Sequence, residues 1–230
     1  MRIEPTALPG VLILTPPRFG DHRGFFSESW NRRTLLEAGL ELPEFVQDNH
    51  SLSAKAGTLR GLHYQAPPHA QGKLVRCGRG RLYDVAVDAR RGSPHYGQWV
   101  GVELSAENGR QLWVPAGFLH GFVTREDMTE VVYKCTDHYD RAADGGVRWD
   151  SVGVDWGTDA PVLSEKDTTA PAFADWDSPF DLSDFPAPAW AGKAEVRALR
   201  SSSLAVPGSS ARPSSVRRWR RGTASSTSTR

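Results

Sequence analysis

Short runs of alternating apolar and polar residues dominate the middle of the chain, from about residue 51 to residue 136. The clearest runs are 82–88, 99–104 and 130–136, and turn signals such as Asn108-Gly109 separate them. A period of two places successive side chains on opposite faces of a β-strand. Closely spaced strands without long helical segments between them predict an all-β protein, an antiparallel sandwich or barrel.

The two ends of the chain differ from this middle part. A short helix is expected over 32–38, ended by Gly39. From about residue 191 the chain is rich in Ser, Thr, Ala and Arg and has no apolar period, which predicts a disordered tail. The expected organisation is one folded domain over 1–185 and a basic Ser/Arg-rich tail over 186–230.

The formal net charge of +1 conceals an asymmetry along the chain. Residues 191–230 hold nine Lys and Arg against one acidic residue, so residues 1–190 carry a net charge of −7. Domains that follow phosphate backbones carry clustered positive charge instead. The folded part is therefore not expected to bind nucleic acid.

Hydropathy and cysteine content narrow the class further. The sequence has no run of 18 apolar residues and no signal-peptide pattern, so neither a membrane span nor secretion is expected. Its two cysteines, Cys77 and Cys135, are far apart and form no C-x-x-C pair, so neither a disulfide framework nor a thiolate zinc site is expected. A cytoplasmic location is the resulting prediction.

Three polar side chains are expected on strand faces shared with small or apolar neighbours. On a strict period of two, His63 lies on one face with Leu59 and Gly61, and Lys73 and Tyr133 lie within similar runs. An unpaired lysine on such a face is costly, so Lys73 either reaches the rim or has a function. His63 alone would be compatible with a structural histidine, whereas the three together favour chemistry.

The segment 115–122 reads P-x-G-x-x-H-x-x and resembles the second motif of cupins, small β-barrels of the jelly-roll type. Metal-binding cupins pair that histidine with an H-x-H sequence and a glutamate, ligands suited to a divalent ion. Here the corresponding sequence is His63-Tyr64-Gln65, so the second histidine is missing. No bound metal is expected.

Seven motifs in order and in register extend this resemblance from about residue 3 to about residue 180. They lie at residues 21–28, 47–51, 59–65, 71–74, 115–122, 133–136 and 163–167. Together they resemble the dTDP-4-dehydrorhamnose 3,5-epimerase family. This resemblance implies a cupin-type jelly roll, a double-stranded β-helix barrel with a few short helices.

The family resemblance implies a reaction and roles for individual residues. The substrate would be dTDP-4-dehydro-6-deoxy-D-glucose, whose C4 ketone acidifies the hydrogens at C3 and C5, and the product dTDP-4-dehydro-L-rhamnose. His63 would be the base, oriented by Asp167, and Tyr133 would return a proton from the opposite face. Lys73, with His120 nearby, would stabilise the enolate oxygen. No cofactor is expected, because the carbon skeleton stays at one oxidation level.

Further residues are implied in binding. Arg23 and Arg60 would hold the diphosphate, which guanidinium groups suit. The residues implied around the thymidine part are Phe26, Glu28, Gln47, Asn49 and Tyr139, with Tyr139 stacking on the base, and Asp144 stands where the family usually has glutamate. The family resemblance also implies a homodimer that exchanges N-terminal segments, so that Arg23, Phe26 and Glu28 act in the partner's site.

Three other functions share parts of this pattern. A C3-only or C5-only epimerase of antibiotic deoxysugar biosynthesis would keep the same acid and base residues. A non-catalytic sugar-nucleotide-binding cupin is disfavoured because His63, Asp167, Lys73 and Tyr133 are all present. A metal-dependent cupin oxygenase is disfavoured by Gln65.

Overall fold

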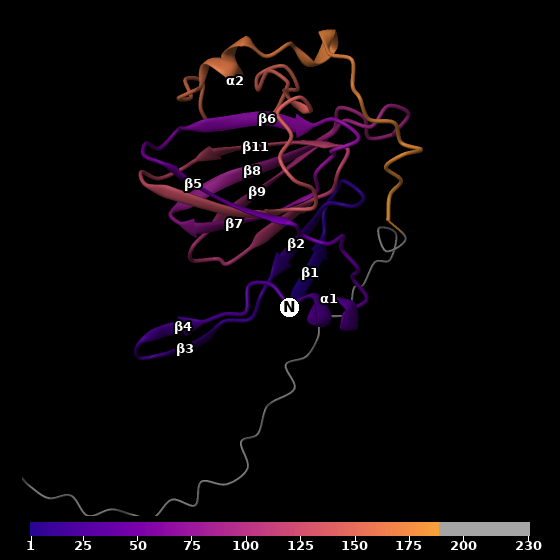
Figure 1. Cartoon of the computed structure of the whole chain (residues 1–230). Coiled ribbons are helices and arrows are strands. Elements are labelled where there is room, and N and C mark those ends of the chain that lie inside the picture. The colour runs from indigo at the N-terminus through magenta and orange to yellow at the C-terminus, as the bar shows by residue number, and fades with distance from the viewer. Residues whose placement is uncertain (189–230) are drawn as a thin grey trace, which may run out of the picture. The chain divides into compact units, whose positions relative to one another are not determined.

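The computed structural model describes residues 1–188 of the chain, which belong to one compact unit, Met1–Leu199. Most of its regular structure is antiparallel strand (Figure 1). The elements in chain order are β1 (Arg2–Pro5), β2 (Leu12–Thr15), β3 (Phe19–Asp21), β4 (Gly24–Phe26), α1 (Arg32–Glu37), β5 (Gln47–Ser53), β6 (Leu59–Gln65), β7 (Lys73–Arg79), β8 (Arg81–Asp88), β9 (Trp99–Ser105), β10 (Gln111–Val114), β11 (Phe118–Thr124), β12 (Thr129–Cys135), β13 (Asp144–Gly146), α2 (Glu165–Thr169) and the 3-10 turn η1 (Phe173–Asp175).

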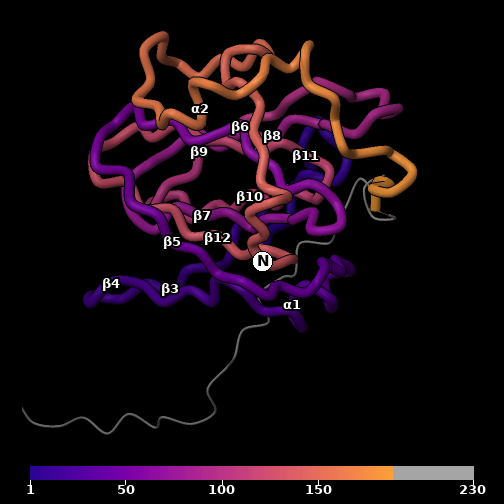
Figure 2. The backbone as a smooth tube through the Cα atoms, turned by 45° about the horizontal axis from the view of Figure 1, so that its top comes forward, coloured from indigo at the N-terminus to yellow at the C-terminus, as the bar shows by residue number. Residues whose placement is uncertain are grey.

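Two sheets face each other and form the barrel walls (Figure 2). The six-stranded sheet has the order β1-β2-β10-β7-β12-β5, and the five-stranded sheet has the order β13-β6-β11-β8-β9. Residues from both walls, among them Val75, Ala86, Leu104 and Val131, are buried together in one cluster. The inward-facing side chains of both sheets fill this core, while strands such as β11 are buried along their whole length.

The outer face of each sheet is also covered. Outside the six-stranded sheet, Leu35 of α1 and Leu40 pack with Leu74 and Trp113. Asn31 caps α1, since its side chain accepts a hydrogen bond from the Thr34 amide.

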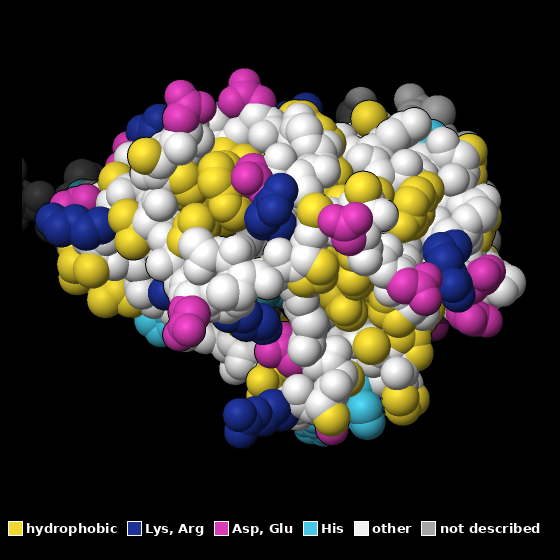
Figure 3. All heavy atoms as spheres, turned by 90° about the horizontal axis from the view of Figure 1, so that it is seen from above, with side chains coloured by type: hydrophobic (Ala, Val, Ile, Leu, Met, Phe, Trp, Pro, Cys, Tyr) yellow, Lys and Arg dark blue, Asp and Glu magenta, His cyan; other side chains and the backbone are white. Residues whose placement is uncertain are grey.

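The chain after β12 covers the five-stranded sheet. Val147, Trp156 and Phe180 pack there against Leu62 and Leu119. Seen from that side, charged side chains of both signs are scattered between apolar patches (Figure 3).

A bulge in β6 changes which residues point into the barrel. His63 pairs with His120 of β11, but Arg60 pairs with Phe122, so three residues of β6 span what two residues of β11 span. His63 and Arg60 therefore share the inward face, whereas Leu59 is buried in the outer cluster. The prediction that Leu59 shares a face with His63 is wrong, because strict alternation assumes an unbroken register.

The β3–β4 hairpin extends away from the barrel (Figure 1). Its side chains Phe19, Phe25 and Phe26 are 59%, 60% and 70% exposed. An isolated two-stranded hairpin is marginally stable in water. Three exposed phenylalanines on such a hairpin point to a surface that another molecule covers.

The all-β jelly-roll prediction is confirmed, and the predicted helix is present as α1 with Gly39 at φ +81° directly after its end. None of the helices within residues 1–188 is long and apolar enough to cross a membrane. The division into a domain over 1–185 and a tail over 186–230 stays a prediction. The predicted disorder concerns residues beyond those described.

Gly61 is a position where the bulge requires glycine. Its φ is +127°, and an added Cβ would lie 2.6 Å from the Cα of Gly121. We expect Gly61→Ala to lower the free energy of unfolding by about 3 kcal/mol, since backbone strain and a backbone overlap combine. Gly57, at φ +78° with no atom near its Cβ position, is the control, and Gly57→Ala should cost only about 1 kcal/mol. Equal urea midpoints for the two variants would contradict this role.

Candidate active site

A histidine and a buried aspartate form a dyad between β6 and α2. The Nε2 atom of His63 lies 2.6 Å from Oδ1 of Asp167, whose side chain is 3% exposed. Ser164 caps α2 by accepting a hydrogen bond from the Asp167 amide, and its hydroxyl donates to Oδ2 of Asp167 at 2.7 Å. Ser164 thus holds one carboxylate oxygen of Asp167, and the other oxygen fixes the orientation of the His63 imidazole.

The charge state of Asp167 fixes the tautomer of His63. Burial by itself raises the pKa of this carboxyl, but hydrogen bonds from His63 and Ser164 outweigh burial and hold the pKa below its usual value. An ionised carboxylate can only accept, so Nε2 of His63 must carry the proton. In the neutral imidazole, Nδ1 is then the nitrogen without a proton, the one that a general base uses.

A second dyad lies beside the first. His120 pairs with His63 across β11 and β6, and its Nε2 atom is 2.7 Å from Oδ1 of Asp84 on β8. Asp84 is completely buried, and its Oδ2 atom has no hydrogen-bond partner within residues 1–188. Sequence reasoning missed Asp84. The available signal was an acidic residue in phase with Leu82 and Ala86 in an alternating strand, because a buried acid needs a partner.

The opposite wall presents Lys73 and Tyr133. Lys73 pairs with Cys135 between β7 and β12, and Tyr133 pairs with Val75, so both side chains lie on the inner face of the six-stranded sheet. Burial lowers the pKa of the Lys73 ammonium, and the carboxylates of Asp144 and Asp84 oppose that change.

Burial also raises the pKa of the Tyr133 hydroxyl, against the opposing charge of Arg60. Tyr133 is therefore protonated at neutral pH and able to donate. A proton donor on the six-stranded sheet thus faces a proton acceptor on the five-stranded sheet.

A polar network connects β5 with the loop after β12. Gln47 donates from Nε2 to Oδ1 of Asn49 at 3.0 Å and accepts from the Tyr139 amide at 2.8 Å. Asn49 lies directly opposite Tyr133 in the pairing of β5 with β12. The ring of Tyr139 is 57% exposed. This network fixes an exposed aromatic ring beside the strand that carries Tyr133.

Two further predicted residues lie on strands next to the dyad. Arg60 shares the inward face of His63 and donates to the carbonyl of Leu52 at 3.3 Å. Asp144 pairs with Gln65, and its carboxylate forms an ion pair with Lys166 at 2.5 Å. The shorter carboxylate at position 144 is therefore engaged with α2 in this chain.

Gln65 stands where metal-binding cupins have a histidine. Its Nε2 atom donates to the carbonyls of His69 and His138, and its Oε1 atom accepts from the Asp140 amide. These three hydrogen bonds of Gln65 hold two loops together. Residues 1–188 contain no cluster of three or more His, Cys, Asp or Glu that could hold a metal ion.

The predicted site residues fall into two groups. Nine of them, together with Tyr139, belong to the barrel walls, α2 and the adjoining loop: His63, Asp167, Lys73, Tyr133, His120, Arg60, Gln47, Asn49 and Asp144. Arg23 and Phe26 lie in or at the exposed β3–β4 hairpin, and Glu28 follows it. Arg23 is paired with Asp21 of its own hairpin. This single chain does not bring the hairpin group to the dyad.

Comparison with known proteins decides the family. The sequence model described as dTDP-4-dehydrorhamnose 3,5-epimerase matches residues 5–175. The chain belongs to this family. The resemblance inferred from the seven motifs is thereby confirmed, and the chain is an epimerase, an enzyme of the isomerase class.

The named relatives within the family include both 3,5-epimerases and a 3-epimerase. A dTDP-4-dehydrorhamnose 3,5-epimerase of Shigella flexneri is 52% identical over 179 residues, which are 77% of this chain and 98% of that protein. One of Pseudomonas aeruginosa is 53% identical over 180 residues, again 77% and 98%. A dTDP-4-dehydrorhamnose 3-epimerase of Streptomyces niveus is 36% identical over 172 residues, covering 74% of this chain and 83% of that one.

Solved epimerase structures share the fold. The Bacillus anthracis dTDP-4-dehydrorhamnose 3,5-epimerase with TDP and PPi bound gives a TM-score of 0.72 at 45% identity, covering 75% of this chain and 99% of that chain. A Legionella pneumophila dTDP-6-deoxy-D-glucose-3,5-epimerase in complex with dTDP-4-keto-L-rhamnose gives 0.74 at 42% identity, covering 78% and 97%.

The lowered pKa of Lys73 predicts how the free energy of unfolding depends on pH. A lysine whose folded pKa is below its unfolded value destabilises the fold at neutral pH, and this cost disappears as the pH rises toward the unfolded value of about 10.4. Lys73→Met should therefore raise the free energy of unfolding at pH 7, and the gain should shrink between pH 7 and pH 10. Denaturant unfolding at several pH values measures this.

Lys55→Met is the control for that experiment, because it removes a lysine that is 74% exposed. A gain for Lys73→Met that is absent at pH 7, or equal to the effect of Lys55→Met at every pH, would contradict a buried ammonium at position 73.

Proposed function

We propose that the chain inverts both C3 and C5 of dTDP-4-dehydro-6-deoxy-D-glucose to give dTDP-4-dehydro-L-rhamnose, a reaction of deoxysugar biosynthesis. The observation that carries the proposal is the His63–Asp167 dyad on one sheet with Tyr133 on the other. The names of the relatives favour double over single inversion, since the 3,5-epimerases cited above are 52% and 53% identical and the 3-epimerase is 36% identical.

The first step is proton abstraction. Nδ1 of His63 takes the hydrogen from C3 or C5, and the electron pair of the broken C–H bond moves into the C4 carbonyl to form an enolate. Asp167 stabilises the resulting imidazolium through its hydrogen bond to Nε2. Asp167 stays ionised throughout, because its lowered pKa keeps the carboxylate charged.

The second step returns a proton to the opposite face of the same carbon. Tyr133 is the donor, and its raised pKa keeps it protonated until the enolate forms. The developing negative charge on the C4 oxygen needs a cation or a hydrogen-bond donor beside it. Lys73 and the Asp84-oriented His120 supply these groups from opposite walls of the barrel.

The nucleotide part binds beside the dyad. Arg60 provides charge for the diphosphate, and the network of Gln47, Asn49 and Tyr139 receives the thymidine, with the exposed ring of Tyr139 available for stacking. Asp144 contacts Tyr139 and Lys166 beside this nucleotide-binding part of the site. The reaction needs no cofactor, because the proton removed and the proton returned balance.

We further propose that two copies exchange their β3–β4 hairpins. Arg23, Phe26 and Glu28 would then complete the site of the partner subunit. Support comes from the exposure of three phenylalanines on the hairpin and from its projection away from its own barrel. Exchange would cover this apolar surface and bring a second arginine to the diphosphate. The cytoplasmic location stays a prediction.

Solvent exchange at single carbons tests the acid and base assignments. In deuterium oxide, His63→Ala should lower deuterium incorporation at both C3 and C5 by about 10² to 10⁴-fold, because one base serves both carbons. Tyr133→Phe should still allow exchange but give little inverted product, because the donor on the opposite face is lost. NMR of the recovered sugar nucleotide resolves the two positions.

Two results would count against these assignments. Wild-type exchange in His63→Ala would move the base elsewhere. Exchange at only one carbon in the wild-type protein would make it a C3-only or C5-only epimerase, and the absence of any exchange would leave a sugar-nucleotide-binding protein.

Mixing two defective variants tests hairpin exchange. Arg23→Ala and His63→Ala should each be nearly inactive alone at low substrate concentration. If Arg23 acts in the partner's site, each mixed dimer contains one intact site, and random reassociation should restore about a quarter of the wild-type activity. No recovery, with mixed dimers verified by mass spectrometry, would place Arg23 in its own subunit's site. Light scattering that finds only monomer would exclude exchange altogether.

A further inference from the structure

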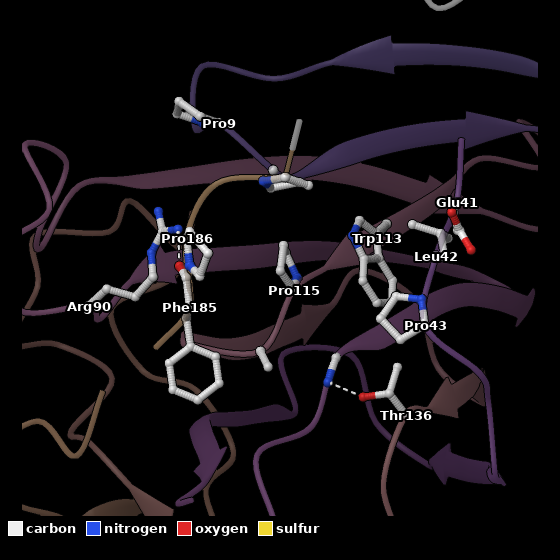
Figure 4. Close-up of a pocket in the computed structure, with 14 residues that line it drawn as sticks. Pro9, Glu41, Leu42, Pro43, Arg90, Trp113, Pro115, Thr136, Phe185 and Pro186 are labelled. Carbon is white, nitrogen blue, oxygen red and sulfur yellow. Dashed lines mark hydrogen bonds between the residues drawn. The ribbon is translucent and has the colours of Figure 1, made fainter. Parts of the chain in front are cut away.

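A groove whose lining does not include the dyad lies beside the end of β10, which carries Trp113 (Figure 4). It has a volume of about 250 Å³ and is lined mainly by apolar side chains. Leu42 and Pro43 form one side, Trp113 and Pro115 lie centrally, and Phe185 closes the other side (Figure 4). None of the residues assigned to the epimerase site lines it. An apolar groove of this kind favours a hydrophobic occupant.

The described chain ends on the rim of this groove. Pro186 and Pro188 are among its lining residues. The approach to the rim is fixed, because the buried guanidinium of Arg90 donates to the Phe185 carbonyl at 3.0 Å and pairs with Asp88 at 2.6 Å. The family match ends earlier, at residue 175. The rim is therefore built partly by sequence beyond the matched family region.

We propose that this groove is the docking site of the chain's own Trp190. One residue, Ala189, separates Trp190 from Pro188, so the Cα of Trp190 lies within about 7 Å of a residue already on the rim. Tethering at this distance gives Trp190 an advantage over any free ligand through its high effective concentration.

The chemistry of the groove suits an indole. Phe185 and the prolines offer faces for the ring, and aromatic pairs stack or pack edge-to-face. A tryptophan N–H usually finds a hydrogen-bond acceptor when it is buried, and the carboxylate of Glu41 lies at the edge of the groove (Figure 4). The rest of the chain beyond residue 190 holds one other tryptophan, Trp219, which lies within an arginine cluster.

Thermal unfolding of the full chain, two substituted chains and two shortened chains tests the proposal. Trp190→Ala should lower Tm by about 2 to 4 °C, the shift expected when a chain of this size loses a modest buried contact. Trp219→Ala is the matched control in the same tail and should leave Tm unchanged. A chain ending at Gly192 should keep the wild-type Tm, whereas a chain ending at Pro188 should unfold like Trp190→Ala.

Cross-linking tests contact directly. Ala116 lines the groove, and in the double variant Ala116→Cys with Ala191→Cys a short bismaleimide should link the two positions within one chain. In the control, Ala116→Cys with Ala224→Cys, this link should not form. Equal Tm values for Trp190→Ala and Trp219→Ala, or equal linking of positions 191 and 224, would overturn the proposal. Links formed only between chains would assign the groove to a second copy and overturn it as well.

Discussion

The close approach of β6 to β11 at Gly61 is the constraint on which the site depends. With no side chain at Gly61, its Cα approaches the backbone of Gly121, and the bulge next to it brings His63 opposite His120 and turns Arg60 inward. The amide of Gly61 also points at the carboxylate of Asp167, at 3.4 Å. One backbone contact therefore positions His63, Asp167 and Arg60 at once.

The two walls of the barrel carry different ionisable side chains. The five-stranded sheet carries two histidine–aspartate pairs, and the six-stranded sheet carries a lysine and a tyrosine whose pKa values burial moves in opposite directions. Such an arrangement costs stability, because charges are held in a poorly solvated interior. In the mechanism that we propose, the same low solvation would strengthen every interaction with a developing enolate. The cost in stability and the gain in catalysis would then have one physical origin.

Apolar layers outside both sheets compensate for that polar interior. The segment after β12 does double work, since it covers the five-stranded sheet with Trp156 and Phe180 and also delivers Asp167 from a five-residue helix fixed by Ser164. The same segment runs on to the groove that we assign to Trp190. Packing of the cover and positioning of the dyad are thus coupled through one stretch of chain.

The sequence by itself determined the sheet architecture, the end of α1 at Gly39 and the residue types of the site, because alternation, glycine and motif spacing are local signals. Family resemblance supplied the roles of His63, Asp167 and Tyr133. Only the tertiary structure decided that Leu59 faces outward and Arg60 inward, since a bulge is defined by pairing with another strand. It alone revealed Asp84 as the partner of His120 and the commitment of Gln65 to two loops. Such pairings join residues 36 and 73 positions apart, and no local pattern encodes which of the available partners a buried polar group will meet.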